Sequence, residues 1–161
     1  MPELNPYARF LDGRPLEAIL AHTPLVLEEL TATIGPLHST ERPAPGKWSA
    51  AEILSHLADC ELVFAFRLRQ TLAEENPTIQ PFDQDKWAAT YGSITATQAL
   101  TTFIALRHWN LLLIHESLPA AADKPITHPE RGAMTFQTIV ETMAGHDLNH
   151  LAQLERIAAA S

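Results

Sequence analysis

Two histidines four residues apart, His146 and His150, carry the strongest chemical signal in this sequence. On a helix, residues i and i+4 lie on one face about one turn apart, so both imidazole rings can reach one metal ion. A chain with eight histidines can produce one such pair by chance, so a metal site requires a third ligand.

His56 is the candidate for this third ligand. It lies between Ile53 and Cys60 on the apolar stripe of a predicted helix, while the other two histidines lie on the stripe of the last predicted helix. Burying an imidazole without a partner costs roughly 1–3 kcal/mol, and a metal ion removes that cost. Three histidine ligands leave a position for water or substrate, as in catalytic sites. The alternative for a single inward histidine is a hydrogen bond to a carbonyl or carboxylate group.

Two polar residues follow the candidate ligands at helical spacing. Gln153 comes three residues after His150 and could hydrogen-bond a ligand ring, and Asp59 comes three residues after His56 and could orient its imidazole. An ordinary hydrogen bond on the helix surface or between helices is the alternative for both.

Arg67 and His128 are the candidates for substrate binding. Arg67 follows His56 by eleven residues, about three turns, so it could hold an anionic substrate on the same face; a structural salt bridge is the alternative. His128 could line the wall of the site. Asp83 and Asp85 could lie at its mouth, although a capped surface turn explains them equally well.

Rival chemistries fit the sequence less well. Cys60 is one turn beyond His56, but no nearby positive charge favours a thiolate, so a small buried side chain is the better interpretation than a ligand or nucleophile. The His146-Asp147-xx-His150 string lacks the glutamate of the HExxH proteases. The sequence contains neither the ExxH of di-iron bundles nor the CxxCH of attached haem.

Clusters of proline divide the chain into four apolar blocks, and each block predicts a helix. Capping-box pairs mark the starts of the second helix (Ser49 and Glu52) and of the third (Thr95 and Gln98). The first helix is expected to be one long helix bent at Pro24, and the alternative is a fresh start there with Thr23 as the cap. The predicted ranges are about 14–34, 49–75, 95–118, and 135 to the end.

These helices predict an all-α fold in one domain, residues 1–161. No alternating β-branched run with a tight glycine turn appears, so no sheet is expected. Four amphipathic helices then bury their stripes against one another as a four-helix bundle. The connections 35–48, 76–94 and 119–134 are long for hairpins, so at least one is expected to cross the length of the bundle.

Composition excludes several function classes. The net charge of −8 disfavours nucleic acid and anionic membranes as partners. No signal peptide or membrane-spanning run is apparent, and the single cysteine excludes an internal disulfide, so a cytoplasmic protein is expected.

Two stretches together resemble the signatures of the DinB-like (DinB/YfiT-like) superfamily. They are Trp48-Ser49-Ala50-Ala51-Glu52-Ile53-Leu54-Ser55-His56-Leu57-Ala58-Asp59-Cys60-Glu61 and Gly145-His146-Asp147-Leu148-Asn149-His150-Leu151-Ala152-Gln153. The resemblance spans nearly the whole chain. It implies a four-helix bundle with a long crossover, a divalent metal, usually zinc or nickel, on the histidines at 56, 146 and 150, and a homodimer.

A resemblance of this kind predicts the metal site more reliably than it predicts the substrate. Superfamily members of known activity include transferases and isomerases that use a low-molecular-weight thiol. The expected function is therefore a metal-dependent thiol transferase or hydrolase acting on a small molecule. The alternative is a metal- or small-molecule-binding stress-response protein or sensor without turnover.

Overall fold

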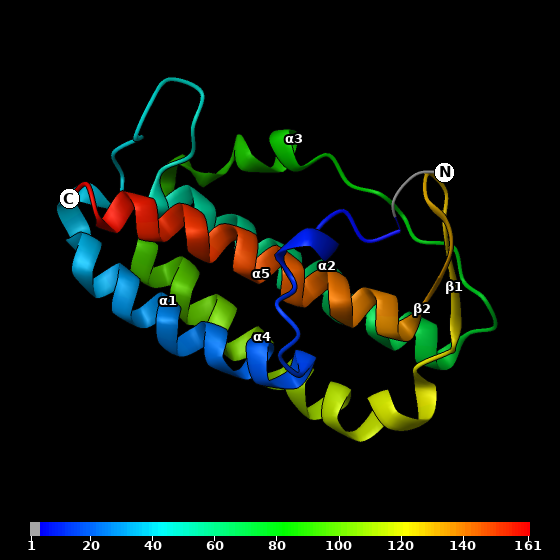
Figure 1. The fold of residues 1–161 in the computed structure, drawn as a ribbon. Helices are drawn as coiled ribbons and strands as arrows, with labels where there is room; N and C mark the ends of the chain where they lie inside the picture. Colours follow the sequence, from blue (N-terminus) through cyan, green and yellow to red (C-terminus); the bar gives the residue numbers. More distant parts are fainter. Residues whose placement is uncertain (1–3) are drawn as a thin grey trace.

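Four long helices carry most of the chain and pack side by side (Figure 1). In the computed structural model, which describes residues 4–161, they are α1 (Leu16–His38), α2 (Ala50–Ala73), α4 (Ala96–Ala121) and α5 (Phe136–Ala158). The predicted four-helix bundle is confirmed. The shorter elements are η1 (Ala8–Phe10), α3 (Gln84–Ala88), η2 (Tyr91–Ser93), β1 (Pro125–His128) and β2 (Gly132–Thr135).

Local capping fixes where three of the long helices begin. Ser49 and Thr95 each accept a hydrogen bond from the backbone N–H three residues later, and the side chains of Glu52 and Gln98 return the bond, as the capping boxes predict. Thr135 caps α5 by accepting from the N–H of Thr138. Helix α4 continues past its predicted end at residue 118 to Ala121, and Pro119 lies within its last turn.

The first helix is continuous across Pro24, so no fresh start with Thr23 as cap occurs there. The backbone of α1 remains helical through Pro24, and its non-helical residue is Gly35, with φ of 73°. Glycine adopts this conformation without a steric penalty, so the helix breaks there. Pro24 has no N–H to donate to the Leu20 carbonyl, and that oxygen instead accepts a hydrogen bond from Arg107 on α4 at 2.9 Å. A partner from another helix therefore offsets the missing bond.

The connection between α2 and α4 is the predicted crossover. Figure 1 shows it running back along the bundle through α3, so that α2 and α4 lie parallel and α1 and α5 run the opposite way. Helix α2 packs against α4 on one side and α5 on the other. The arrangement places α2 and α5 face to face, although α4 intervenes in sequence.

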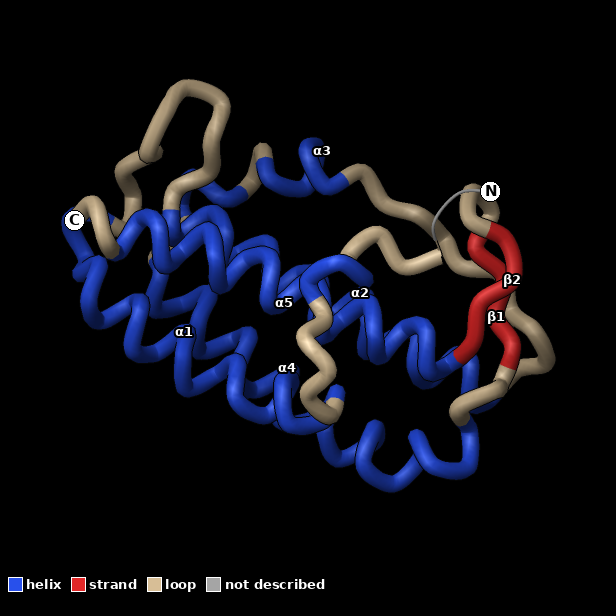
Figure 2. The backbone as a smooth tube through the Cα atoms, in the orientation of Figure 1, coloured by secondary structure: helices blue, strands red, loops and turns tan. Residues whose placement is uncertain are grey.

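The expectation that the chain forms no sheet is wrong in one place. Strands β1 and β2 pair antiparallel between α4 and α5, with Ile126 opposite Met134, and form the small hairpin coloured red in Figure 2. Each strand has only four residues, and Pro125 and Gly132, residue types that are depleted in strands, begin them, so the sequence pattern is too short to predict a strand. Thr78 also pairs with Thr127 and ties the crossover connection to the hairpin.

The core consists of two apolar clusters along the bundle. On α5, Ala144 belongs to the cluster near the hairpin and Leu151 to the cluster at the other end. The buried polar positions His146 and His150 lie between these two residues in sequence. Within residues 4–161, no helix combines the length and apolar character needed to cross a membrane.

Candidate metal centre

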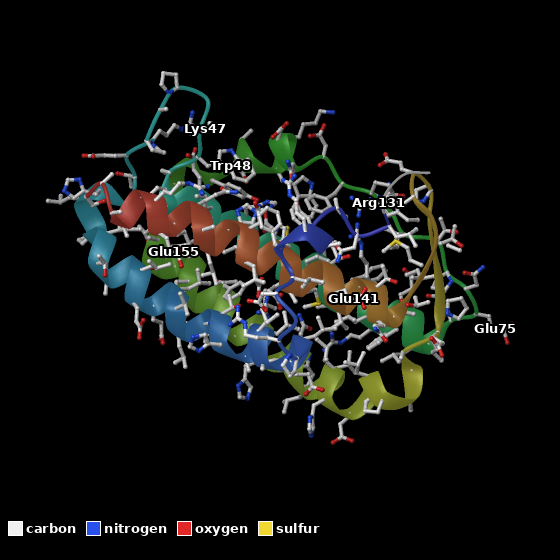
Figure 3. All side chains as sticks on the ribbon, in the orientation of Figure 1. Lys47, Trp48, Glu75, Arg131, Glu141 and Glu155 are labelled. Atoms are coloured by element: carbon white, nitrogen blue, oxygen red, sulfur yellow. The ribbon has the colours of Figure 1, made fainter. Side chains whose placement is uncertain are left out.

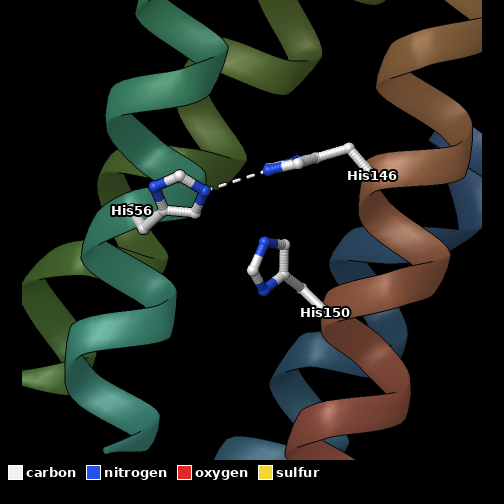
Figure 4. A group of neighbouring side chains, drawn as sticks. All are labelled: His56, His146 and His150. Atoms are coloured by element: carbon white, nitrogen blue, oxygen red, sulfur yellow. Dashed lines mark hydrogen bonds between the residues drawn. The ribbon is translucent and has the colours of Figure 1, made fainter. Parts of the chain in front are cut away.

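Three buried imidazole rings converge between α2 and α5 (Figure 4). The Nε2 atoms of His56 and His146 lie 3.0 Å apart, and one ring nitrogen from each of His56, His146 and His150 lies within 4.8 Å of the others. All three side chains are at most 5% exposed. The structure thus brings together the three residues that the sequence selects as ligands.

This donor set fits a divalent metal ion. Two histidine nitrogens bound to one tetrahedral ion at about 2.0–2.1 Å lie roughly 3.4 Å apart, close to the His56–His146 separation. The Nδ1 atom of His150 is buried without a hydrogen-bond partner among the described residues. The alternative, in which each buried ring is hydrogen-bonded to a carbonyl or carboxylate group, is therefore not met at this atom.

The histidines are held in the neutral form that metal coordination needs. Burial lowers the pKa of His56 to about 3, and the neighbouring His150 adds to the effect. Burial also lowers the pKa of His150 to about 4, although the Gln153 side chain acts in the opposite sense. The pKa of His146 falls well below its ordinary value for the same reason, with both other histidines contributing. Near pH 7 all three rings have a free lone pair.

The two neighbours predicted to support the ligands have different partners. Asp59 accepts a hydrogen bond from the Tyr91 hydroxyl at 2.8 Å, so it has a partner other than His56. Gln153 acts on His150 through a side-chain hydrogen bond that opposes the lowering of its pKa, as predicted, and it also lines a second surface pocket with Trp48. The Trp48 ring, at 4.9 Å between ring centroids, covers the outer side of His56.

Cys60 lies beside the site but outside the group of convergent nitrogens. Its Sγ is 3.5 Å from the Nε2 of His56, and the side chain is buried. Burial, with Glu61 adding to it, raises the pKa of this thiol well above its usual range. The protonated, buried thiol matches the prediction of a small apolar side chain.

A cavity of about 210 Å³ opens onto His56 and His146. Helix α2 supplies one face of its wall, with His56, Cys60, Phe64 and Arg67 one above another. The predicted wall residue His128 is there, and its Nδ1 accepts the backbone N–H of Glu130, so the neutral ring carries its proton on Nε2. The remaining wall is formed by Tyr7, Pro81, Phe82, Gln84, Glu130, Arg131, Thr142 and His146.

Asp83 and Asp85 do not line this cavity. Asp83 accepts the backbone N–H groups of Asp85 and Lys86 and so caps α3. The capped-turn alternative is therefore correct, and Phe82 and Gln84, on either side of Asp83, reach the wall instead.

The segment before α1 closes one side of the site, which the sequence did not predict. The Tyr7 ring packs edge-on against His146, with ring centroids 5.1 Å apart. The backbone of Tyr7 approaches so closely that a Cβ on Gly145 would lie 2.6 Å from the Tyr7 carbonyl oxygen. Gly145, directly before His146, is therefore the residue that lets this segment reach the centre.

A buried ion network braces the ligand helices, and this too was missed. Arg107 on α4 donates to both oxygens of Asp147 at 2.6 and 3.0 Å and to Glu61 on α2 at 2.7 Å. Asn110 donates to the second oxygen of Glu61 at 2.9 Å. Arg107 and Asn110 lie in register with Phe103 on the apolar stripe of α4, which was the available signal. Asp147 is thus a partner of Arg107 rather than a general base.

Two named relatives are similar to this chain over most of its length. A protein of Oceanobacillus iheyensis, whose name proposes a metal-dependent hydrolase, is 29% identical over 110 residues, which are 68% of this chain and 64% of the relative. One from Bacillus mycoides, named in the same way, is 26% identical over 130 residues, covering 78% of this chain and 75% of that protein. The chain thus spans less than two thirds of the first of these relatives.

The fold and the family agree with the resemblance seen in the sequence. YfiT from Bacillus subtilis, described as a probable metal-dependent hydrolase with an unusual four-helix bundle topology, superposes with a TM-score of 0.83 over 90% of this chain and 85% of that one, at 18% identity. The family profile of the DinB superfamily matches residues 19–154, a range that includes all three histidines. The chain therefore belongs to the DinB superfamily.

Proposed function

We propose that this protein is a metal-dependent enzyme that acts on a small molecule, as a hydrolase or a transferase of a low-molecular-weight thiol. The observation that carries the proposal is the convergence of His56, His146 and His150, two of which, His56 and His146, line a cavity. A divalent ion on three imidazoles supplies a Lewis acid and lowers the pKa of a bound water or thiol. Zinc or nickel is the proposed metal, although three imidazoles also suit copper and iron.

The residues of this chain prepare the site for that chemistry. The low pKa values of the histidines keep the ring lone pairs free near neutral pH. Tyr7 and Trp48 cover two sides of the ligand rings and limit the access of water. The cavity leads to His56 and His146 and leaves room for a substrate beside the ligands. An open side of this kind is expected of a catalytic rather than a closed structural centre.

Elemental analysis of protein purified without a polyhistidine tag tests the ligand set. We expect about one zinc or nickel per chain in the wild type and loss of that metal in His56→Ala and His146→Ala. His22→Ala, which removes an exposed histidine from α1, should retain the metal. Equal stoichiometric metal in His56→Ala and the wild type would show that the assignment is wrong.

Turnover separates an enzyme from a binding protein. Metal-loaded protein is incubated with an electrophile and a panel of low-molecular-weight thiols, and separately with hydrolysable esters and amides, against the His56→Ala variant. Metal-dependent consumption supports the enzyme. If the two proteins behave identically with every thiol and with water, a metal- or small-molecule-binding protein without turnover becomes the better interpretation. A homodimer and a cytoplasmic location stay predictions.

A further inference from the structure

The cavity above the histidines is locally positive although the chain is acidic. Two guanidinium groups, Arg67 and Arg131, line it, and Glu130 is the one carboxylate that residues 4–161 contribute to its wall. The whole chain has a formal net charge of −8, so composition alone does not produce this sign. Figure 3 shows Arg131 on the side of the hairpin that faces the bundle. The placement concentrates positive charge where a substrate would enter.

Arg67 lacks the partner that a structural arginine would have. Its Nη2 donates to the carbonyl oxygen of Gln80 at 3.3 Å, and within residues 4–161 no carboxylate forms an ion pair with it. Burial lowers the pKa of Arg67, and the like charge of Arg131 acts in the same direction. The salt bridge that the sequence left open for Arg67 is not formed among these residues, so most of its donors are free.

Arg107 is an example of a structural arginine in this fold. Its guanidinium is 1% exposed and is paired with both Asp147 and Glu61. A desolvated cation without a counter-ion is costly, and proteins normally pair it in this way. Arg67 is only partly buried, and unlike Arg107 it has no carboxylate partner among residues 4–161.

Arg131 and His128 complete the positive side of the cavity. Both residues line the cavity together with Arg67, and the two guanidinium groups lower the pKa of His128, after the larger effect of burial. No hydrogen bond or ion pair within the described chain involves the Arg131 side chain. Because Glu130 N–H occupies His128 Nδ1, the Nε2–H of the neutral ring remains as a further donor. Donors without acceptors thus surround this part of the cavity.

We propose that the cavity selects small molecules carrying an anionic oxygen group, a carboxylate or a phosphate, bound by Arg67 and Arg131. Planar guanidinium forks match both groups by paired hydrogen bonds. The reacting part of the molecule then faces His56 and His146 at the base, so this inference rests on the proposed function for its chemical meaning. A volume of about 210 Å³ is below the range of drug-sized ligand sites and limits the ligand to a few heavy atoms beyond that group.

Calorimetric titration with three small probes tests the inference. Propionate supplies a carboxylate, methyl phosphate a phosphate, and propionamide is the uncharged analogue of propionate. Dissociation constants are measured at constant ionic strength for the wild type, Arg67→Gln, Arg131→Gln and the control Arg156→Gln, which alters an exposed arginine of α5. We expect one of the anions to bind at least tenfold more tightly than propionamide, and to lose at least tenfold in affinity in Arg67→Gln and Arg131→Gln but not in Arg156→Gln.

The comparison of propionate with propionamide needs no variant, so a folding defect in Arg67→Gln does not remove the test. The tighter anion identifies the group as a carboxylate or a phosphate. Repeating the titrations with metal-free protein separates this inference from the metal site, because arginine-dependent anion binding supports it even if no metal binds to the histidines. Anion affinity equal to that of propionamide, or unchanged in both cavity variants, would overturn it while leaving metal binding unaffected.

Discussion

The Nε2 atoms of His56 and His146 lie 3.0 Å apart although 90 residues separate the two in sequence. His56 belongs to α2 and His146 to α5, so the separation depends on how these two helices pack. The Arg107 network, which joins α4 to both helices, holds that packing at the level of the site. The centre is therefore a product of tertiary structure, and its properties should respond to changes in packing.

The metal-free protein should lose stability in acid because its buried histidines stay neutral. The pKa of His56 is about 3 and that of His150 about 4 in the folded state, against 6.5 in the unfolded chain. Below pH 6.5 the unfolded chain binds protons that the folded chain does not. The free energy of unfolding should therefore fall as pH decreases from 6.5 toward 4, by up to about 1.4 kcal/mol per pH unit for each histidine.

Urea unfolding with a chelator, from pH 7.5 to 4.5, measures this dependence. His150→Gln should reduce the slope below pH 6.5 relative to the wild type, whereas His22→Gln, at an exposed position, should not. Carboxylates titrate alike in all three proteins, so the difference isolates the buried ring. An identical slope in His150→Gln would contradict the neutral state of His150.

Cys60 should be neither a ligand nor a reactive thiol. Because burial raises its pKa, alkylation by iodoacetamide at pH 8 should be at least about tenfold slower in the folded protein than in urea. Cys60→Ala should keep the wild-type metal content in elemental analysis. Loss of metal in Cys60→Ala would instead make the sulfur part of the coordination sphere.

Removing the charge of Arg107 should lower the free energy of unfolding more than removing the charge of a surface arginine. Arg107→Met leaves Glu61 and Asp147 buried without their cation, so we expect a loss of about 3–5 kcal/mol in the free energy of unfolding. Arg42→Met removes the exposed partner of Glu52 and should leave stability nearly unchanged. Chemical denaturation of both variants provides the measurement, and equal losses would mean that the network is not a brace.

A methyl group at Gly145 should displace the segment that covers His146. In Gly145→Ala the new Cβ would meet the Tyr7 carbonyl oxygen at 2.6 Å, and the backbone of Tyr7 must move because α5 is fixed by its packing. We expect faster amide hydrogen exchange in residues 5–11. Gly92→Ala, where a Cβ meets nothing within 4 Å, is the matched control. Unchanged exchange in Gly145→Ala would show that Tyr7 does not depend on this contact.

The sequence predicted the features that local chemistry determines. Ser49 and Thr95 mark helix starts because a cap acts within three residues, and the three histidines share apolar stripes because the helical period repeats every 3.6 residues. The stripes also predicted that the histidines of α2 and α5 point into the bundle. The ligand candidates could therefore be found before any tertiary structure was known.

The features that were missed depend on contacts between distant segments. Tyr7 meets Gly145 across nearly the whole chain, and nothing near either residue indicates the other. The Leu20 carbonyl that Pro24 leaves without a helical donor is instead bonded by Arg107 of α4, a partner that the local sequence does not indicate. Arg131 enters the cavity because the short hairpin turns it there, and strands of four residues carry too little pattern to be recognised.

The hairpin formed by β1 and β2 lines the cavity, whereas the candidate metal ligands all belong to α2 and α5. It supplies His128 and Arg131 to the cavity yet contributes no candidate ligand, and only its inner residues, such as Ile126, reach the core. Loops of this kind tolerate changes of length and composition better than the helices they join. Exchanging residues 125–135 among relatives would thus be a route to new substrate preferences on an unaltered reaction centre.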